Sequence, residues 1–410
     1  MITPQITTNR THITMPGLAT VHSHAFQRAM RGLTQRKSLQ AGSFWSWRGV
    51  MYRLAERIDP DTLYVIARLA YLELAMSGVT LVGEFHYVHH QPDGTPYANR
   101  TELADAVIRA ATDVGIRICL IRTAYMRGGF KQVMTPAQRR FSDPSVDLIL
   151  QDVETLQSRY ADNPLVSVAL AAHSIRAVPI GANRELAAWA DERKLPFHMH
   201  VCEQRRELEE CKAEHGMTPI HLLADHGILS ERFVGVHATH LNSAEIQHLG
   251  SHNCFVNLCR TTERDLGDGL PPTLELVKAG AKLCVGVDSH CCENAFEEIR
   301  AIELDARSQH EARTLVGNAD FLLDAGTRLG YAACGLESVW QQDEVQLDAN
   351  DLSLIGLPDS HLADGVIFNA TPRAVQTVRV NQQTIIEDGR HPDMEAITIA
   401  YRQTVRQLLS

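Results

Sequence analysis

The chain lacks the features that mark several large classes of protein. It has no uninterrupted apolar run near the roughly 18 residues of a membrane helix, and residues 1–14 hold no apolar core of signal-peptide length. Its nine cysteines lack the paired spacing of a zinc finger, and Cys291 and Cys292 are adjacent, a poor arrangement for a disulfide framework. The formal net charge of -10 argues against nucleic acid or an anionic membrane as a partner. We therefore expect a cytoplasmic protein with reduced thiols, no membrane and no nucleic-acid partner.

The chain does have many histidines. Its 410 residues include 20 of them, in an otherwise ordinary globular composition that is 44% hydrophobic and 21% charged. His22 and His24 end an apolar run that follows the Pro16-Gly17 turn. Alternate side chains of a strand point the same way, so these two imidazoles are expected to grip one divalent metal ion.

Short β-rich runs alternate with helical stretches along most of the chain. The eight runs are Leu18–His24, Val79–Tyr87, Ile118–Tyr125, Val166–His173, Phe197–Val201, Phe233–His237, Cys254–Leu258 and Lys282–Asp288. Most are apolar nearly throughout, as strands buried on both faces should be. A doubly wound open sheet also fits this alternation. Polar residues at the carboxyl ends of many different strands favour an α/β fold of the (β/α)8 TIM-barrel type.

Helix boundaries carry local signals. Asp59-Pro60 is typical of an N-cap with proline at the first helical position, and Gly78 ends that helix. Asp143-Pro144-Ser145 opens a second helix, and Ala182–Lys194 is predicted as a third that stops before Pro196.

The pattern changes after about Trp340. Four short runs there are predicted as strands: Leu352–Ile355, Gly365–Asn369, Thr377–Val380 and Gln383–Glu387. Before Pro16 there is room for little more than one strand. We therefore predict a barrel over residues 16–340 and a small, reduced β-sandwich appendage made of residues 1–15 and 341–410.

The candidate functional residues stand at the ends of the predicted strands. They are His22, His24, His86, His173, His200, Glu203, His237 and Asp288. An isolated histidine is more often a packed residue than a ligand. Several that converge on one barrel mouth favour a metal site, and three histidines with one aspartate suit Zn²⁺ or a similar ion.

Some of these residues have a structural interpretation as well. Asp288 carries a charge out of an apolar strand, which is costly unless the carboxylate is paired or metal-bound, but it could also cap a helix together with Ser289. Glu203 could carry protons or simply begin a solvated helix. His198 and His200 form a second His-x-His pair, of which both need not be ligands.

Several motifs together resemble a known family, the amidohydrolase superfamily, and within it the deaminases with a single metal ion. The matching segments are His22-Ser23-His24, His200-Val201-Cys202-Glu203, His237-Ala238-Thr239-His240 and Val287-Asp288-Ser289. More narrowly, the chain is similar to the formimidoylglutamate deiminases. The segments that carry this likeness are 22–30, 43–48, 84–90, His173-Ser174-Ile175-Arg176-Ala177-Val178 and Leu266-Gly267-Asp268-Gly269.

The resemblance implies a role for each matching residue. The implied metal ligands are His22, His24, His200 and Asp288. The implied catalytic residues are Glu203, His237 and Asp288. The implied substrate-binding residues are Gln27, Arg48, Tyr87, His173 and Arg176.

The chemistry of the implied substrate-binding residues agrees with a dicarboxylate substrate. Arg48 and Arg176 can each form bidentate, charge-assisted pairs with a carboxylate. Without the resemblance, the sequence favours a different interpretation of Arg48, as a surface guanidinium stacked on Trp45 or Trp47. Tyr87 could be an ordinary aromatic residue at a strand end.

One absence bears on the number of metal ions. Binuclear members of this superfamily carry a carboxylated lysine on the fourth strand, whereas Leu165–Arg176 contains no lysine. We therefore expect one divalent ion, with Zn²⁺ the first choice and Fe²⁺ or Mn²⁺ also compatible. Family resemblance and the frequency of such assemblies suggest a homodimer.

The reaction implied by the resemblance is a hydrolytic deamination in histidine degradation. N-formimino-L-glutamate, a small dicarboxylate amidine, would give N-formyl-L-glutamate and ammonia. Asp288 would accept a proton from the attacking water, His237 would stabilise the tetrahedral centre, and Glu203 would protonate the departing nitrogen.

Two alternatives remain open at this point. The first is another amidine or aminoheterocycle deaminase of the same superfamily, of the guanine or pterin type. The second is a barrel that binds a ligand or metal without turnover. Four arginines, Arg122, Arg127, Arg260 and Arg264, have no role assigned by the resemblance.

Overall fold

The computed structural model describes residues 4–9, 11–35 and 42–409. Eight parallel strands form one sheet in the order β10-β9-β8-β7-β6-β5-β4-β3. Their bounds are β3 Leu18–Ser23, β4 Val79–His86, β5 Arg117–Ala124, β6 Val166–Ala172, β7 Phe197–Val201, β8 Phe233–His237, β9 Phe255–Leu258 and β10 Lys282–Val285. All eight predicted runs are strands, and the predicted TIM-type barrel is confirmed.

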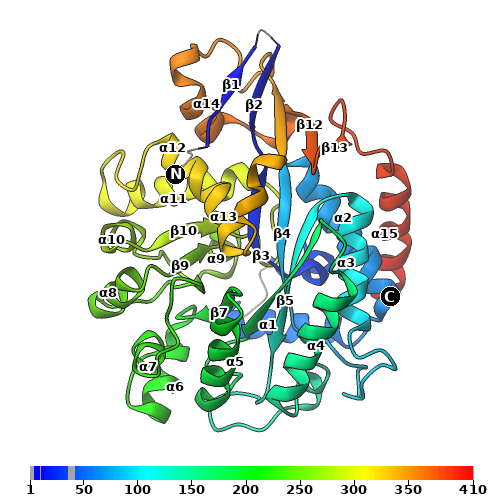
Figure 1. Cartoon of the computed structure of the whole chain (residues 1–410), viewed down its shortest axis with the longest axis vertical. Coiled ribbons are helices and arrows are strands. Elements are labelled where there is room, and N and C mark those ends of the chain that lie inside the picture. The colour runs from blue at the N-terminus through cyan, green and yellow to red at the C-terminus, as the bar shows by residue number, and fades with distance from the viewer. Residues whose placement is uncertain (1–3, 10, 36–41, 410) are drawn as a thin grey trace.

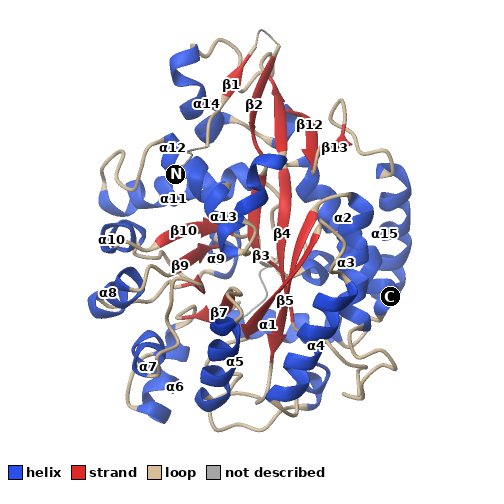
Figure 2. Ribbon diagram, viewed as in Figure 1, coloured by secondary structure: helices blue, strands red, loops and turns tan. Residues whose placement is uncertain are grey.

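Helices lie around the outside of this sheet (Figures 1 and 2). The α-helices that follow the barrel strands or precede them are α1 Phe44–Ala55, α2 Pro60–Met76, α3 Glu102–Val114, α4 Val146–Arg159, α5 Ile180–Glu192, α6 Arg205–His215, α7 Pro219–Asp225, α8 Ser243–Ser251, α9 Arg260–Leu266, α10 Thr273–Ala279, α11 Ala295–His310, α12 Ala319–Gly326 and α13 Arg328–Ala333. Short 3-10 helices are η1 Ala25–Met30, η2 Pro136–Phe141 and η3 Glu337–Gln342.

The predicted helix starts follow the expected capping chemistry. The Asp59 side chain accepts a hydrogen bond from Thr62 N at 2.8 Å, and Ser145 accepts one from Leu148 N at 3.4 Å. The third predicted helix begins at Ile180, two residues before its expected start.

A second, antiparallel sheet of five strands has the order β1-β2-β11-β12-β13. Its strands are β1 Thr7–Thr8, β2 His12–Pro16, β11 Glu344–Asp348, β12 Val375–Val380 and β13 Gln383–Ile386, and Figure 1 shows them at the upper end of the molecule. A β-sandwich has two packed sheets, whereas the described residues of the expected appendage form this one sheet. Residues 1–3, 10 and 410 of the predicted appendage lie outside the described part of the chain.

Two of the strands predicted for the C-terminal segment are wrong. Gly365–Asn369 belongs to helix α14 (Leu362–Asn369), in which Leu362 and Val366, one turn apart, are buried. Residues 352–355 form turns, and Leu352 and Ile355 are exposed. The other two runs correspond to β12 and β13. The remaining elements here are η4 Asp359–His361, η5 Pro372–Ala374 and α15 Met394–Leu409, which packs against α2 beside the barrel (Figure 1).

The two sheets are joined covalently and by a buried ion pair. β2 runs into β3 through Gly17, where a Cβ atom would lie 2.0 Å from the Thr80 hydroxyl oxygen. Arg117, at the start of β5, donates to both carboxylate oxygens of Asp343, at 2.7 and 3.0 Å. Both side chains are almost completely buried, and Asp343 also accepts from the Tyr331 hydroxyl and from Asn381 N.

No helix in the described part of the chain combines the length and the apolar character that crossing a membrane requires. All nine cysteines are free thiols.

Replacement of Asp343 should destabilise the protein strongly. Asp343→Ala leaves the buried guanidinium of Arg117 unpaired, which costs about 3–5 kcal/mol of unfolding free energy. Asp191→Ala is the matched control, because it breaks an exposed pair with Arg232 and should change stability by less than about 1 kcal/mol. Urea unfolding of both variants measures the difference, and equal losses would contradict the assigned role of the buried pair.

Candidate metal centre and active site

Four side chains from three distant strand ends meet at one point. His22 is in β3, His24 follows it, His200 is in β7, and Asp288 follows β10. The Nε2 atoms of His22 and His24 are 3.1 Å apart, those of His22 and His200 are 3.1 Å apart, and those of His24 and His200 are 3.4 Å apart. Asp288 Oδ1 lies 3.6 Å from His22 Nε2 and 3.4 Å from His24 Nε2. Tetrahedral zinc with bonds of 2.0–2.1 Å separates its ligand atoms by about 3.4 Å.

The hydrogen bonds of two histidines direct their lone pairs at this point. His24 Nδ1 donates to the carbonyl oxygen of Phe85 at 2.9 Å, and His200 Nδ1 donates to that of His173 at 2.9 Å. A carbonyl oxygen only accepts, so the hydrogen of each neutral ring is on Nδ1 and each Nε2 carries a lone pair. Two lone pairs that face each other at 3.4 Å repel unless a cation lies between them. The four residues therefore fit a divalent metal ion.

Burial sets the charge states that such an ion requires. It lowers the pKa of His22 to about 3, and it also lowers the pKa of His24 and of His200. Although burial opposes its ionisation, the hydrogen bond with His22 and the neighbouring histidines lower the pKa of Asp288 below its usual value. The donor set at neutral pH is three uncharged imidazoles and one carboxylate.

The barrel closes at this same cluster. Asp288 N donates to the His22 carbonyl oxygen at 2.9 Å, and His24 N donates to the Asp288 carbonyl oxygen at 2.9 Å. Asp288 has a φ of 53°, in the left-handed region that non-glycine residues rarely adopt. The backbone bonds between β3 and the residues after β10 thus place three of the four candidate ligands. The alternative reading of Asp288 as a helix cap is wrong, since the next helix begins at Ala295.

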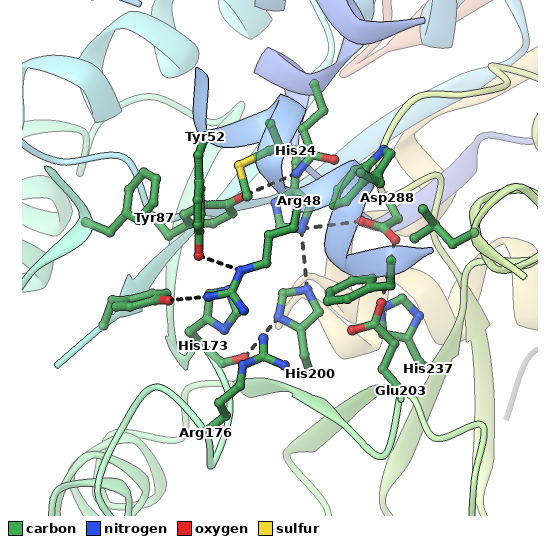
Figure 3. A pocket seen from close by; sticks show the side chains of 17 residues that line it. His24, Arg48, Tyr52, Tyr87, His173, Arg176, His200, Glu203, His237 and Asp288 are labelled. Atoms are coloured by element: carbon green, nitrogen blue, oxygen red, sulfur yellow. Dashed lines mark hydrogen bonds and ion pairs between the residues drawn. The ribbon is translucent and has the colours of Figure 1, made fainter. Parts of the chain in front are cut away.

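A cavity opens beside the cluster. Its walls include every residue expected to bind substrate, namely Gln27, Arg48, Tyr87, His173 and Arg176. They also include Glu203, His237 and Asp288. Figure 3 shows Arg48 and Arg176 extending toward His173 on one side, with Glu203, His237 and Asp288 gathered on the other.

The two arginines hold no carboxylate of the described chain. Arg48 Nε donates to the Tyr52 hydroxyl at 2.5 Å and Nη2 donates to the Tyr125 hydroxyl at 3.5 Å. Arg48 also stacks over Trp45, with 5.5 Å to the ring centroid, so the stacking interpretation is correct but the side chain lines the cavity. The Nε atom of Arg176 is buried with no hydrogen-bond partner among the described residues. The two guanidinium groups leave positive charge facing the cavity.

Two neutral donors lie close to the metal cluster. Gln27 Nε2 donates to the Tyr87 hydroxyl at 3.0 Å, and Gln27 Oε1 has no partner among the described residues. Tyr87 packs edge-on against His24 and His173, so it is part of the cavity wall rather than an isolated strand-end aromatic. Burial and the charges of Arg176 and Arg48 lower the pKa of His173, which is therefore neutral.

Glu203, His237 and Asp288 form a second group at the cavity floor. His237 Nε2 lies 3.9 Å from Glu203 Oε1 and 3.9 Å from Asp288 Oδ2. Burial raises the pKa of Glu203, so its proton is held more tightly than that of a surface glutamate. Burial favours the neutral ring of His237, but the charges of Glu203 and of two other carboxylates raise its pKa to about 10. The solvated-helix reading of Glu203 is wrong, because the side chain is only 7% exposed.

Two sequence candidates lie outside the cavity. His86 packs against His89 with ring centroids 5.4 Å apart and does not line the cavity. His198 points the same way as His200 but lies one layer deeper, where its Nε2 donates to the Ala333 carbonyl oxygen at 3.1 Å.

The four unassigned arginines are paired with carboxylates away from the cavity. Arg122 binds Asp143 and Asp152, and Arg127 binds Glu214. Arg260 binds Glu263 and Asp305, and Arg264 binds Glu297 and Asp305. They therefore add no charge to the cavity wall.

Sequence reasoning missed three polar residues that support the site. Tyr52 lies four residues after Arg48 on α1, a spacing that puts both on one helix face and that could have revealed it. Tyr125 ends the third predicted strand, as the recognised candidates do. Glu263, which binds His237 Nδ1, is in the first turn of α9 and has no comparable signal in the sequence.

Comparison with known proteins identifies the family. The sequence profile of the Amidohydrolase family matches residues 13–339. This chain belongs to the amidohydrolase family. The resemblance stated from the motifs is confirmed, and so is the enzyme class, a hydrolase of carbon–nitrogen bonds.

Individual relatives cover most of the chain. The formimidoylglutamate deiminase of Pseudomonas aeruginosa is 35% identical over 412 aligned positions, which cover 96% of this chain and 89% of that protein. The 8-oxoguanine deaminase of the same species is 29% identical over 70% of this chain and 62% of its own length. Among solved structures, an amidohydrolase from Brucella melitensis has a TM-score of 0.90 at 33% identity, covering 97% of this chain and 90% of its own. An atrazine chlorohydrolase from Arthrobacter aurescens, complexed with zinc, has a TM-score of 0.84 at 25% identity, covering 96% and 88%.

Gly286 packs directly against His22, so the size of the residue at this position affects the candidate metal centre. A Cβ atom there would lie 2.8 Å from His22 Cβ and 2.7 Å from Asn257 Nδ2, so Gly286→Ala must displace the first ligand strand. We expect the affinity for Zn²⁺ to fall by about 10–100-fold, with a stability loss of about 1–3 kcal/mol.

Gly181→Ala is the matched control, because nothing lies within 4 Å of its added methyl group. Competition with a chromophoric chelator measures the zinc affinity of both variants. Equal affinities would show that Gly286 does not set the position of His22.

Proposed function

We propose that this protein hydrolyses N-formimino-L-glutamate to N-formyl-L-glutamate and ammonia, with one Zn²⁺ ion per chain. The observation that carries the proposal is the pair of guanidinium groups, Arg48 and Arg176, that face the cavity without carboxylate partners in the described chain. A substrate with two carboxylates supplies what they lack, through charge-assisted bidentate hydrogen bonds. As expected from the sequence, we also propose a cytoplasmic homodimer that takes part in histidine degradation.

The metal would be held by His22, His24, His200 and Asp288. Their donor set suits Zn²⁺, Fe²⁺ and Mn²⁺, and zinc is proposed because structural relatives are complexed with it. A divalent ion in such a site lowers the pKa of water toward neutrality, so that hydroxide is available near pH 7.

The proposed acid–base work falls to the three groups at the cavity floor. Asp288 accepts the proton of the attacking water. His237 donates a hydrogen bond to the tetrahedral centre that forms at the formimino carbon. Glu203, whose buried position raises its pKa, delivers one proton to the departing nitrogen. The second proton comes from the hydroxyl group of the tetrahedral centre as the C=O bond forms and the C–N bond breaks, and the proton taken up by Asp288 then restores Glu203. His237 Nε2 lies 3.9 Å from an oxygen of each of the other two groups, so all three can face the same reacting carbon.

The 35% identity with a formimidoylglutamate deiminase supports this substrate. Matches to deaminases of 8-oxoguanine and of 5-methylthioadenosine/S-adenosylhomocysteine leave aminoheterocycle deamination as the second candidate. Such a substrate lacks the carboxylates that would pair with the charges of Arg48 and Arg176, so it uses the two guanidinium groups less fully.

Ammonia release distinguishes the candidate substrates. We expect turnover of formiminoglutamate at a kcat/KM at least roughly 100-fold above that of formiminoaspartate or guanine, because the polar groups of the cavity stay unpaired with the wrong ligand. A coupled glutamate dehydrogenase assay measures the released ammonia. Preferred turnover of guanine would overturn the proposal.

Removal of one guanidinium tests carboxylate recognition directly. Arg176→Met should lower kcat/KM for formiminoglutamate by about 10–100-fold, the equivalent of the 1.5–3 kcal/mol of a hydrogen bond to a charged group. Arg264→Met, which removes an arginine outside the cavity, is the matched control and should retain wild-type kinetics. A wild-type KM in Arg176→Met would exclude contact between this arginine and a substrate carboxylate.

Metal removal and one isosteric substitution test the catalytic roles. Dialysis against a chelator should abolish ammonia release, and added Zn²⁺ should restore it, which a barrel that only binds ligands could not show. Asp288→Asn should abolish turnover while the circular dichroism spectrum stays that of the folded protein. Near-wild-type kcat in this variant would refute the assigned role of Asp288.

A further inference from the structure

The two ring nitrogens of His237 have different surroundings. Nε2 faces the cavity, 3.9 Å from Glu203 Oε1 and 3.9 Å from Asp288 Oδ2 (Figure 3). Nδ1 faces the barrel wall, 3.1 Å from Glu263 Oε1. Glu263 does not line the cavity, so it touches His237 but not a bound substrate.

Glu263 is itself held rigidly. Its side chain is 0% exposed. Oε1 also accepts a hydrogen bond from Cys259 N at 3.0 Å, and Oε2 accepts one from the guanidinium of Arg260. Arg260 Nε in turn donates to Asp305 Oδ2 at 2.7 Å. The carboxylate cannot rotate without breaking several charge-assisted bonds.

These contacts also define the charge of Glu263. Burial opposes its ionisation, but the hydrogen bond with His237 and the charge of Arg260 lower its pKa below the usual value. An ionised carboxylate only accepts hydrogen bonds, so the hydrogen between the two groups belongs to Nδ1 of His237.

The backbone of His237 gives a reason for this support. His237 has a φ of 73° and Ala238 a φ of 50°, so two consecutive non-glycine residues are in the left-handed region. Such conformations persist only where surrounding contacts impose them. The bond to Glu263 is one such contact on the ring.

From this geometry we infer that Glu263 is a positioning residue for His237. Its carboxylate fixes the orientation of the imidazole ring and keeps a hydrogen on Nδ1. Only Nε2 is then left to contact the reacting atoms. Arg260 anchors Glu263, which gives this otherwise unassigned arginine a role. The inference rests on the proposed function of His237 as the group that contacts the tetrahedral centre.

Kinetics of Glu263→Gln test the role, since glutamine keeps the size and one acceptor but removes the charge. We expect kcat to fall by about 10–100-fold, less than the roughly 10²–10⁴-fold of a positioned acid–base group itself. KM and zinc content should stay at wild-type values. Glu298→Gln is the matched control, because Glu298 is equally buried but binds Thr261 rather than His237.

A double-mutant cycle separates positioning from general stabilisation. In the His237→Asn background, Glu263→Gln should change kcat by less than about twofold, because the group that it positions is gone. The same loss in both backgrounds, or wild-type kcat in Glu263→Gln, would overturn the inference.

Two further tests need no substrate, and the first is the zinc content of the wild type and of Glu263→Gln. His237, Cys259 and Glu263 also lie close enough to share a metal ion. A second equivalent of zinc in the wild type that disappears in Glu263→Gln would overturn the positioning role in favour of a second metal site.

The second substrate-free measurement is the proton spectrum of the zinc-loaded enzyme. It should contain a downfield Nδ1–H resonance that is absent in His237→Asn and in Glu263→Ala. This resonance tests the bond even if formiminoglutamate is not the substrate, so the two proposals can fail separately.

Discussion

The functional centre depends on how the eight-stranded barrel closes. The chain after β10 returns to β3 through hydrogen bonds between the backbones of Asp288, His22 and His24. Those bonds bring the first and last strands of the barrel together, and they fix three of the four candidate metal ligands at the seam. Ligands on one rigid seam need little rearrangement to bind an ion, and the strained φ of Asp288 is maintained by the same bonds.

The arginines within the wall and the arginines that face the cavity mostly differ in whether a carboxylate of the chain binds them. Arg117, Arg122 and Arg260 are deeply buried, and each donates to at least one carboxylate of the chain. Burial of an unpaired guanidinium is costly, so such partners are required for folding. Arg48 and Arg176 line the cavity and have no carboxylate partner among the described residues. Arg140 is also buried without a carboxylate, but it donates to the carbonyl oxygens of Ala55, Ile58 and His90 within the wall. A site that leaves positive charge unpaired next to a metal centre is suited to a small anionic ligand.

Layers of contacts support each side chain that faces the cavity. Tyr52 and Tyr125 hold Arg48, and Arg127 donates to the carbonyl oxygens of Ile175 and Arg176. Glu263 holds His237, and Phe85 packs against the rings of His22 and His200 with centroids 4.8 and 4.4 Å apart. Catalysis by positioned groups needs this precision, because small displacements of the reacting atoms reduce the rate strongly.

The sequence by itself determined the barrel and most of the candidate site. Apolar runs buried on both faces have a distinct pattern, and His22, His200 and Asp288 stand where those runs end. Short apolar runs in the C-terminal segment are ambiguous, since Gly365–Asn369 fits a strand or a helix equally well. In the structure this run is helical and packs against α11 and α12. Only the tertiary structure decided which polar residues meet: it placed His198 one layer below His200, paired Arg122 and Arg260 within the wall, and brought Glu263 to His237. The physical reason is that strand patterns report which face is buried, whereas hydrogen-bond partners depend on the distances that closure of the barrel sets between residues far apart in the chain.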